Sequence, residues 1–134
     1  MKFTVKVVPH SSQRYNTVGD WQFSENGTLH IKISDFGDWR MVWAVAIHEL
    51  VETYLCQRAG VTEAMVDEFD FAYDARRSSG DSSEPGDDPQ APYFKQHQFA
   101  TKVEKLVCAV FLVNWKKYLA RTEELMRSYP LTTA

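Results

Sequence analysis

The sequence predicts an α+β fold, in which a small antiparallel sheet of about three strands is followed by three main helices, the last of them long or broken. Within residues 3–33, apolar and polar residues alternate in short runs, as they do in half-buried strands. From residue 38 onward the apolar residues recur at helical spacing instead. A chain of 134 residues has the size of one domain, so we expect residues 1–134 to form a single unit.

The β region is expected over residues 1–34. Residues 3–8 alternate until Pro9 ends the run, and shorter runs follow at residues 21–23 and 29–33. Asn26 and Gly27 lie between the last two runs, and both residue types tolerate the positive φ angles of a tight hairpin turn. These runs therefore predict neighbouring antiparallel strands.

The first helix is expected over residues 38–60. Asp38 is a suitable N-cap, and Gly60 follows the last helical residue. Residues 41–47 are apolar on every side of the helix, which leaves no face for water. This pattern predicts a helix that is largely buried.

Two further helical regions follow. The second helix is expected over residues 62–78, with Asp67, Asp70 and Asp74 on a solvated face. An acidic loop, residues 79–92, leads to the C-terminal helical region at residues 93–129. One straight helix of that length would span roughly 55 Å, so we expect a break, near Asn114.

Composition excludes several classes of protein. The net charge is −3, with 25% charged residues, so neither nucleic acid nor an anionic membrane surface is an expected partner. No apolar run approaches the roughly 20 residues of a membrane-spanning helix, and the N-terminus lacks the apolar segment of a signal peptide. Both cysteines lie in apolar helical patterns and are expected to be reduced. These observations predict a soluble, cytoplasmic protein.

The most informative motif is His48-Glu49-Leu50-Val51-Glu52, directly after the apolar run. His48 and Glu52 are four residues apart, so they lie on one face of the helix, with Glu49 beside that face. Burying such groups without partners costs several kcal/mol each, and a divalent cation would remove that cost. The motif therefore predicts a metal site, with Glu49 placed to hydrogen-bond a bound water.

Strands followed by a buried helix with His-Glu-x-x resemble the core of the zincin metallopeptidases, whose motif is His-Glu-x-x-His. The resemblance covers roughly residues 20–60 and implies that His48 is a metal ligand and Glu49 the general base. Glu52 stands where the family has its second histidine. A carboxylate there still binds metal, with zinc as the first expectation and Mn or Fe as alternatives. Small phage-type proteins have similar features.

A third protein ligand is needed, and His97 is the expected one. It lies early in the third helix, and Glu104 follows seven residues later on the same stripe. If this helix packs beside the first, Glu104 becomes a fourth ligand or a residue that orients His97. Asp87 and Asp88 are alternatives, because the acidic loop would lie over the same site, and Asp67 and Asp70 are the next candidates.

Each of these side chains also has a purely structural interpretation. His48, Glu49 and Glu52 could form a half-exposed face paired with Lys or Arg, and His97 could be a surface residue at a helix start. Glu104 could form exposed ion pairs with its neighbouring lysines.

The predicted function is metal-dependent hydrolysis of an amide or ester, with a peptide or protein as substrate. The alternative is a non-enzymatic protein-binding module with a structural metal or none. Four Trp, six Tyr and eight Phe exceed what a small core needs, which favours an exposed aromatic surface in that alternative.

Overall fold

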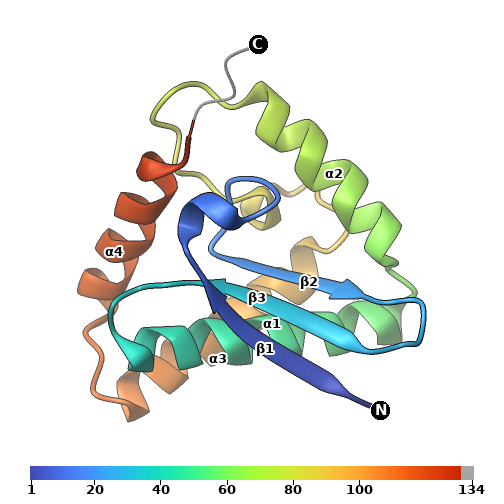
Figure 1. Cartoon of the computed structure of the whole chain (residues 1–134), viewed down its shortest axis with the longest axis horizontal. Helices are drawn as coiled ribbons and strands as arrows, with labels where there is room; N and C mark the ends of the chain where they lie inside the picture. The colour runs from blue at the N-terminus through green and yellow to red at the C-terminus, as the bar shows by residue number, and fades with distance from the viewer. Residues whose placement is uncertain (131–134) are drawn as a thin grey trace.

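The structure, a computed structural model, describes residues 1–130 and confirms the α+β fold (Figure 1). Within these residues, three strands precede four helices. The strands are β1 (Phe3–Val8), β2 (Gly19–Phe23) and β3 (Leu29–Ser34). The helices are α1 (Trp39–Ala59), α2 (Glu63–Arg76), α3 (Phe94–Val110) and α4 (Trp115–Ser128). Short 3-10 turns are η1 (His10–Ser12) and η2 (Pro85–Asp87).

The sheet has the strand order β1-β3-β2, which makes it mixed. β2 and β3 form the expected antiparallel hairpin, with Trp21 opposite Ile31 and a positive φ of 82° at Gly27 in the turn. β1, however, pairs parallel to β3, so the expectation of antiparallel pairing is wrong for this strand. The reason is that β3 inserts between β1 and β2, and residues 9–18 give no sequence signal for that order.

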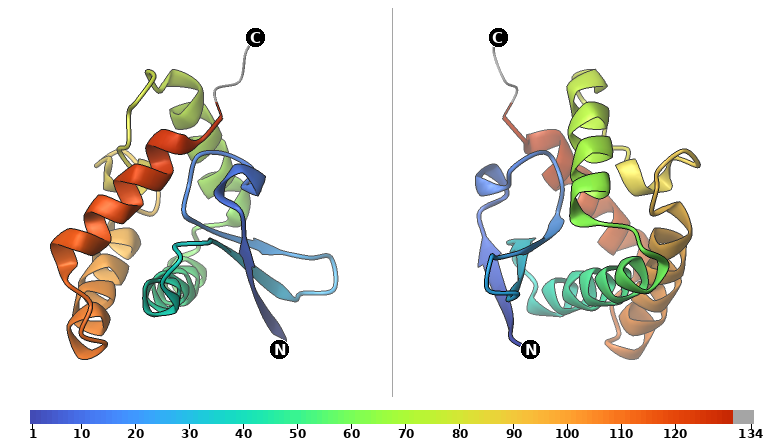
Figure 2. Two further views of the ribbon diagram at one scale, coloured as in Figure 1. Left: turned by 60° about the vertical axis from the view of Figure 1, so that its left-hand side comes forward. Right: turned by 90° about the vertical axis from the view of Figure 1, so that its right-hand side faces the viewer.

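One face of the sheet forms the core against α1. Leu29, Ile31 and Ile33 alternate along β3 and are almost fully buried, as the period-two pattern predicted. Figure 2 shows α1 beneath this face, with α3 on the other side of α1. α1 is therefore the element between the sheet and the C-terminal helices.

α1 begins and ends where the sequence predicted. The Asp38 side chain accepts a hydrogen bond from the Arg40 amide, and Gly60 ends the helix in the left-handed conformation. The helix is not buried on every side, because Trp39 and Trp43 are 72% and 54% exposed. Its outer face is thus apolar and uncovered within residues 1–130.

The C-terminal helical region is broken near Asn114, as predicted. α3 ends at Val110, Leu112 has a positive φ of 59°, and the Asn114 side chain caps α4 by accepting from the Lys117 amide. The break lets α4 fold back on α3 (Figure 1), and the Asn16 side chain donates to the Met126 carbonyl near the end of α4 at 2.8 Å. Among the described residues, no helix combines the length and the apolar character needed to cross a membrane.

Candidate metal centre

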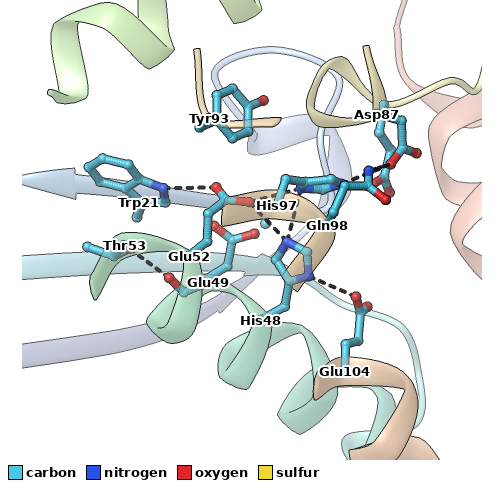
Figure 3. A network of polar contacts seen from close by, with 12 residues as sticks. Trp21, His48, Glu49, Glu52, Thr53, Asp87, Tyr93, His97, Gln98 and Glu104 are labelled. Carbon is cyan, nitrogen blue, oxygen red and sulfur yellow. Dashed lines mark hydrogen bonds and ion pairs between the residues drawn. The ribbon is translucent and has the colours of Figure 1, made fainter. Parts of the chain in front are cut away.

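The expected metal ligands meet between α1 and α3. His48 and Glu52 lie on consecutive turns of α1, and His97 lies in the first turn of α3. Glu52 Oε2 is 3.1 Å from His48 Nε2 and 2.9 Å from His97 Nδ1. The two imidazole nitrogens are 3.2 Å apart. Figure 3 shows the three side chains pointing toward one another.

This triangle of donor atoms has nearly the size of one face of a metal coordination shell. Zinc binds its ligands at about 2.0–2.1 Å in a tetrahedron, which places neighbouring donors roughly 3.3 Å apart. All three side chains are buried, at 4–6% exposure. A small adjustment of each side chain would therefore accommodate an ion, with the fourth direction left for water or substrate.

The outer nitrogen of His48 is held by a carboxylate. His48 Nδ1 is 2.8 Å from Glu104 Oε1, and the Tyr118 hydroxyl donates to the second oxygen of Glu104. Such carboxylate–histidine pairs fix the ring orientation of metal-bound histidines. Glu104 was expected either to ligate the ion or to orient His97. In the structure it contacts His48 and not His97, because α3 places it about two turns after His97.

The outer nitrogen of His97 faces the acidic loop. Asp87 Oδ1 and Glu84 Oε2 lie 3.3 and 3.4 Å from His97 Nε2. These carboxylates are not aligned for a hydrogen bond, so within residues 1–130 this buried nitrogen has no hydrogen-bond partner. Asp88 does not join the site, because its side chain instead accepts from the Gln90 amide at 2.9 Å.

The backbone packs very closely against two of the site residues, His97 and Glu49, and a glycine stands at each point of contact. A Cβ atom on Gly86 would lie 2.5 Å from His97 Nδ1, and one on Gly19 would lie 2.7 Å from Glu49 Cδ. Neither contact is tolerated without movement of the neighbour. Only glycine at both positions lets the loop and β2 pack this closely on the site.

Glu49 and the three expected ligands line one cavity of about 60 Å³. That volume holds a few water molecules, at roughly 10–15 Å³ each. Trp21 also lines this cavity, and its indole nitrogen donates to Glu52 Oε1 at 3.2 Å, leaving Oε2 for the triangle. Glu49 thus lines the same cavity as the expected ligands.

Electrostatics in the metal-free protein favour a cation at the triangle. Burial alone would lower the pKa of His48, but Glu104 and Glu52 outweigh it and raise that pKa well above its ordinary value. The pKa of His97 is raised likewise, because Asp87 and Glu52 outweigh burial. Burial alone would raise the pKa of Glu52, yet the two imidazoles lower it to about 2. The buried Glu52 carboxylate thus favours positive charge between the two imidazoles, and a divalent ion would supply such charge.

The pKa of Glu49 is raised, in contrast to the pKa of Glu52. Burial, followed by the negative charge of Glu52, raises it well above its ordinary value. Both effects favour the protonated form of Glu49 in the metal-free protein. A nearby divalent ion would lower this pKa and favour the carboxylate form, which is the form a general base requires.

One acid that the sequence analysis assigned to a solvated face is buried. Asp70 was expected on a solvated face of α2, but it is 3% exposed and accepts hydrogen bonds from Tyr15 and Tyr93 at 2.5 and 2.6 Å. Burial raises its pKa to about 6. The spacing of Asp67, Asp70 and Asp74 could not reveal this, because the two tyrosines come from distant segments of the chain.

Comparisons with known proteins give no relative. No family model, no curated protein and no solved structure matches this chain.

Proposed function

We propose that the protein is a zincin-like, metal-dependent hydrolase of the cytoplasm that cleaves an amide or ester in a peptide or protein. The observation that carries the proposal is the arrangement of the two imidazoles. Each directs one nitrogen to the Glu52 carboxylate and the other toward a second carboxylate, Glu104 for His48 and Asp87 for His97. Metal-binding histidines typically have such partners. The free, buried thiols of Cys56 and Cys108 fit a reducing compartment.

The donor set supports zinc and a catalytic role. Two histidines and one glutamate form the protein ligands of several catalytic zinc sites, which keep the fourth position for water. Compared with His-Glu-x-x-His, Glu52 takes the place of a histidine, and His97 from α3 supplies the missing imidazole. The overall donor set is thus preserved although the motif is not. Mn and Fe are the alternatives, since both accept imidazole and carboxylate ligands.

The chemistry follows from what each residue can do. A bound divalent ion would supply Lewis acidity, which lowers the pKa of water and polarises a carbonyl. Glu49 would accept the proton of the attacking water and return it to the leaving group. Trp21 and Glu104 would keep Glu52 and His48 oriented through their hydrogen bonds.

The central experiment separates metal binding from turnover. Metal content is measured on protein purified without added metal, and hydrolysis is measured on a panel of peptide and ester substrates. Glu49→Gln should retain the metal and lose at least about 100-fold in kcat, because the general base is removed. Glu68→Gln, at an exposed position of α2, serves as the matched control and should retain both.

His48→Ala should abolish metal binding itself. A protein that retains stoichiometric metal after this substitution would contradict the assigned ligand, and equal activity of Glu49→Gln would remove Glu49 from the mechanism.

A second candidate function is a non-enzymatic protein-binding module with a structural metal. The outer faces of α1 and α3 favour it, because large apolar side chains there are 54–70% exposed. They are Trp43, Tyr54, Phe99, Leu106 and Val110. Surfaces of this kind mark interaction sites.

The simplest partner to test is a second copy of the chain, by sedimentation of the purified protein. Dimers that Leu106→Glu dissociates, but Leu119→Glu on α4 does not, would support this function. Monomers at all concentrations would count against pairing through this face.

A further inference from the structure

A second cavity of about 200 Å³ adjoins the candidate metal centre. Its walls come from residues 82–87, from α3 and from α4. Glu84 and Glu104 line both cavities, so this groove opens directly beside the expected position of the reacting bond. Its volume is more than ten times the roughly 10–15 Å³ that one water needs, which leaves room for a substrate side chain.

The groove is acidic although the whole chain has a net charge of only −3. Glu84, Asp87, Glu104 and Glu123 line it, and among the described residues no lysine or arginine does. The metal cavity differs, because His48 and His97 line it together with its carboxylates. The groove itself therefore has charged side chains of one sign in its lining, which attract cations.

One wall of the groove is aromatic. Trp115 lines it, beside Leu119, and the ammonium group of Lys105 lies 5.8 Å above the Trp115 ring. That distance is within the range of a cation–π interaction, so a cation of the chain itself already lies near this ring. An aromatic face, an aliphatic side chain and carboxylates suit a long side chain with an apolar stem and a positive end.

An independent observation comes from His97. Its imidazole is 6% exposed, and Nε2 is directed at Asp87 and Glu84, the two loop carboxylates of the groove, without forming a hydrogen bond to either. The two carboxylates pair with the imidazole by charge, without an aligned hydrogen bond. Their hydrogen-bonding capacity is therefore not used up by His97, and a cationic group in the groove could share them.

We propose that the groove between η2, α3 and α4 is a subsite for a lysine or arginine side chain of the substrate, adjacent to the bond that is cleaved. The inference rests on the proposed hydrolase function for the identity of that bond, whereas the binding of a cationic side chain stands on the groove alone.

The test measures binding, not turnover, on the full chain with and without added zinc. Nα-acetyl-lysine amide is titrated into labelled protein and followed by two-dimensional NMR, with Nα-acetyl-norleucine amide as the neutral probe of similar shape. The lysine probe should bind about tenfold more tightly, since ion pairs and a cation–π contact each contribute a few-fold. Shifts should map to Trp115 and its neighbours.

Matched variants locate the effect. Glu123→Gln should weaken the lysine probe about three- to fivefold, because it removes a 53% exposed carboxylate of the groove that contacts no metal ligand. Glu124→Gln is the control, since it makes the same charge change on the same helix outside the groove. Trp115→Leu should also weaken the probe, and Trp39→Leu should not.

Several results would overturn the subsite: equal binding of the two probes, equal effects of Glu123→Gln and Glu124→Gln, or shifts confined to another surface. The two proposals fail separately. If the protein bound the lysine probe but hydrolysed no substrate, the subsite proposal would stand and the hydrolase proposal would fail. If it hydrolysed substrates without a preference for lysine, the hydrolase proposal would stand and the subsite proposal would fail.

Discussion

Gly86→Ala should disable the metal site although Gly86 is not a ligand. The new Cβ would lie 2.5 Å from His97 Nδ1, whereas ordinary contacts begin at 3.4 Å. The imidazole or the loop must therefore move by at least 0.5 Å to reach 3.0 Å, the shortest contact that Cβ atoms show, and by 0.9 Å to restore an ordinary contact. Metal–ligand distances tolerate only about 0.2 Å. The backbone of Gly86 does not have a positive φ, so alanine is compatible with the local conformation.

The expected loss of zinc affinity is at least tenfold, whichever part moves. If His97 moves, the site loses a ligand. If the loop moves, His97 loses its outer carboxylates Glu84 and Asp87, and loss of such partners typically costs about 10–100-fold. Competition against a chromophoric chelator gives the affinity, and the visible spectrum of the cobalt-substituted protein reports the coordination number.

Gln90→Ala, an exposed change in the same loop, is the control and should bind zinc normally. Circular dichroism checks that both variants fold. Wild-type affinity in folded Gly86→Ala, within about threefold, would refute the argument that this close approach positions His97.

Three further predictions follow from other contacts. Tyr118→Phe should weaken zinc about tenfold, measured by the same competition, because Glu104 would lose the hydroxyl that holds it against His48; unchanged affinity would remove Tyr118 from the site. Zinc at 100 times its Kd should raise the free energy of unfolding by about 2.7 kcal/mol in urea titrations, and His48→Ala should abolish this gain. Asp70→Asn should change the pH dependence of metal-free stability. Because burial raises the pKa of Asp70 from 3.8 to about 6, its protonated form stabilises the fold below pH 3.8, and about 3 kcal/mol is lost as the pH rises through 6. Urea titrations between pH 4 and 7 should show that decline in the wild type relative to the variant, and parallel curves would contradict it.

Local sequence patterns correctly predicted the parts of the fold that depend on residues close together in the sequence. The Asn26-Gly27 hairpin, the caps of α1 and the break at Asn114 all follow from turn and capping preferences. The parallel placement of β1 could not be predicted, because strand order depends on contacts across the whole sheet.

The same distinction applies to the site. His48 and Glu52 were placed together by helix geometry alone, and His97 by the expected packing of α3 on α1. The partners that hold them were not predicted. Trp21 lies 31 residues from Glu52 in the sequence, and no sequence motif indicated that its indole N–H would donate to Glu52. The role of Tyr118 could not be predicted either, because its contact with Glu104 forms only when the chain reverses direction at the break before α4.

The two glycines that touch the site give it a signature beyond the five-residue motif. Gly19 precedes His48 by 29 residues, and Gly86 precedes His97 by 11. A distant homologue could exchange most of its core and still need hydrogen in place of a side chain at these two points. A search pattern that joins Gly, His-Glu-x-x-Glu, Gly and His at tolerant spacings should therefore find relatives that overall sequence similarity misses, and it would exclude chance matches to the short motif.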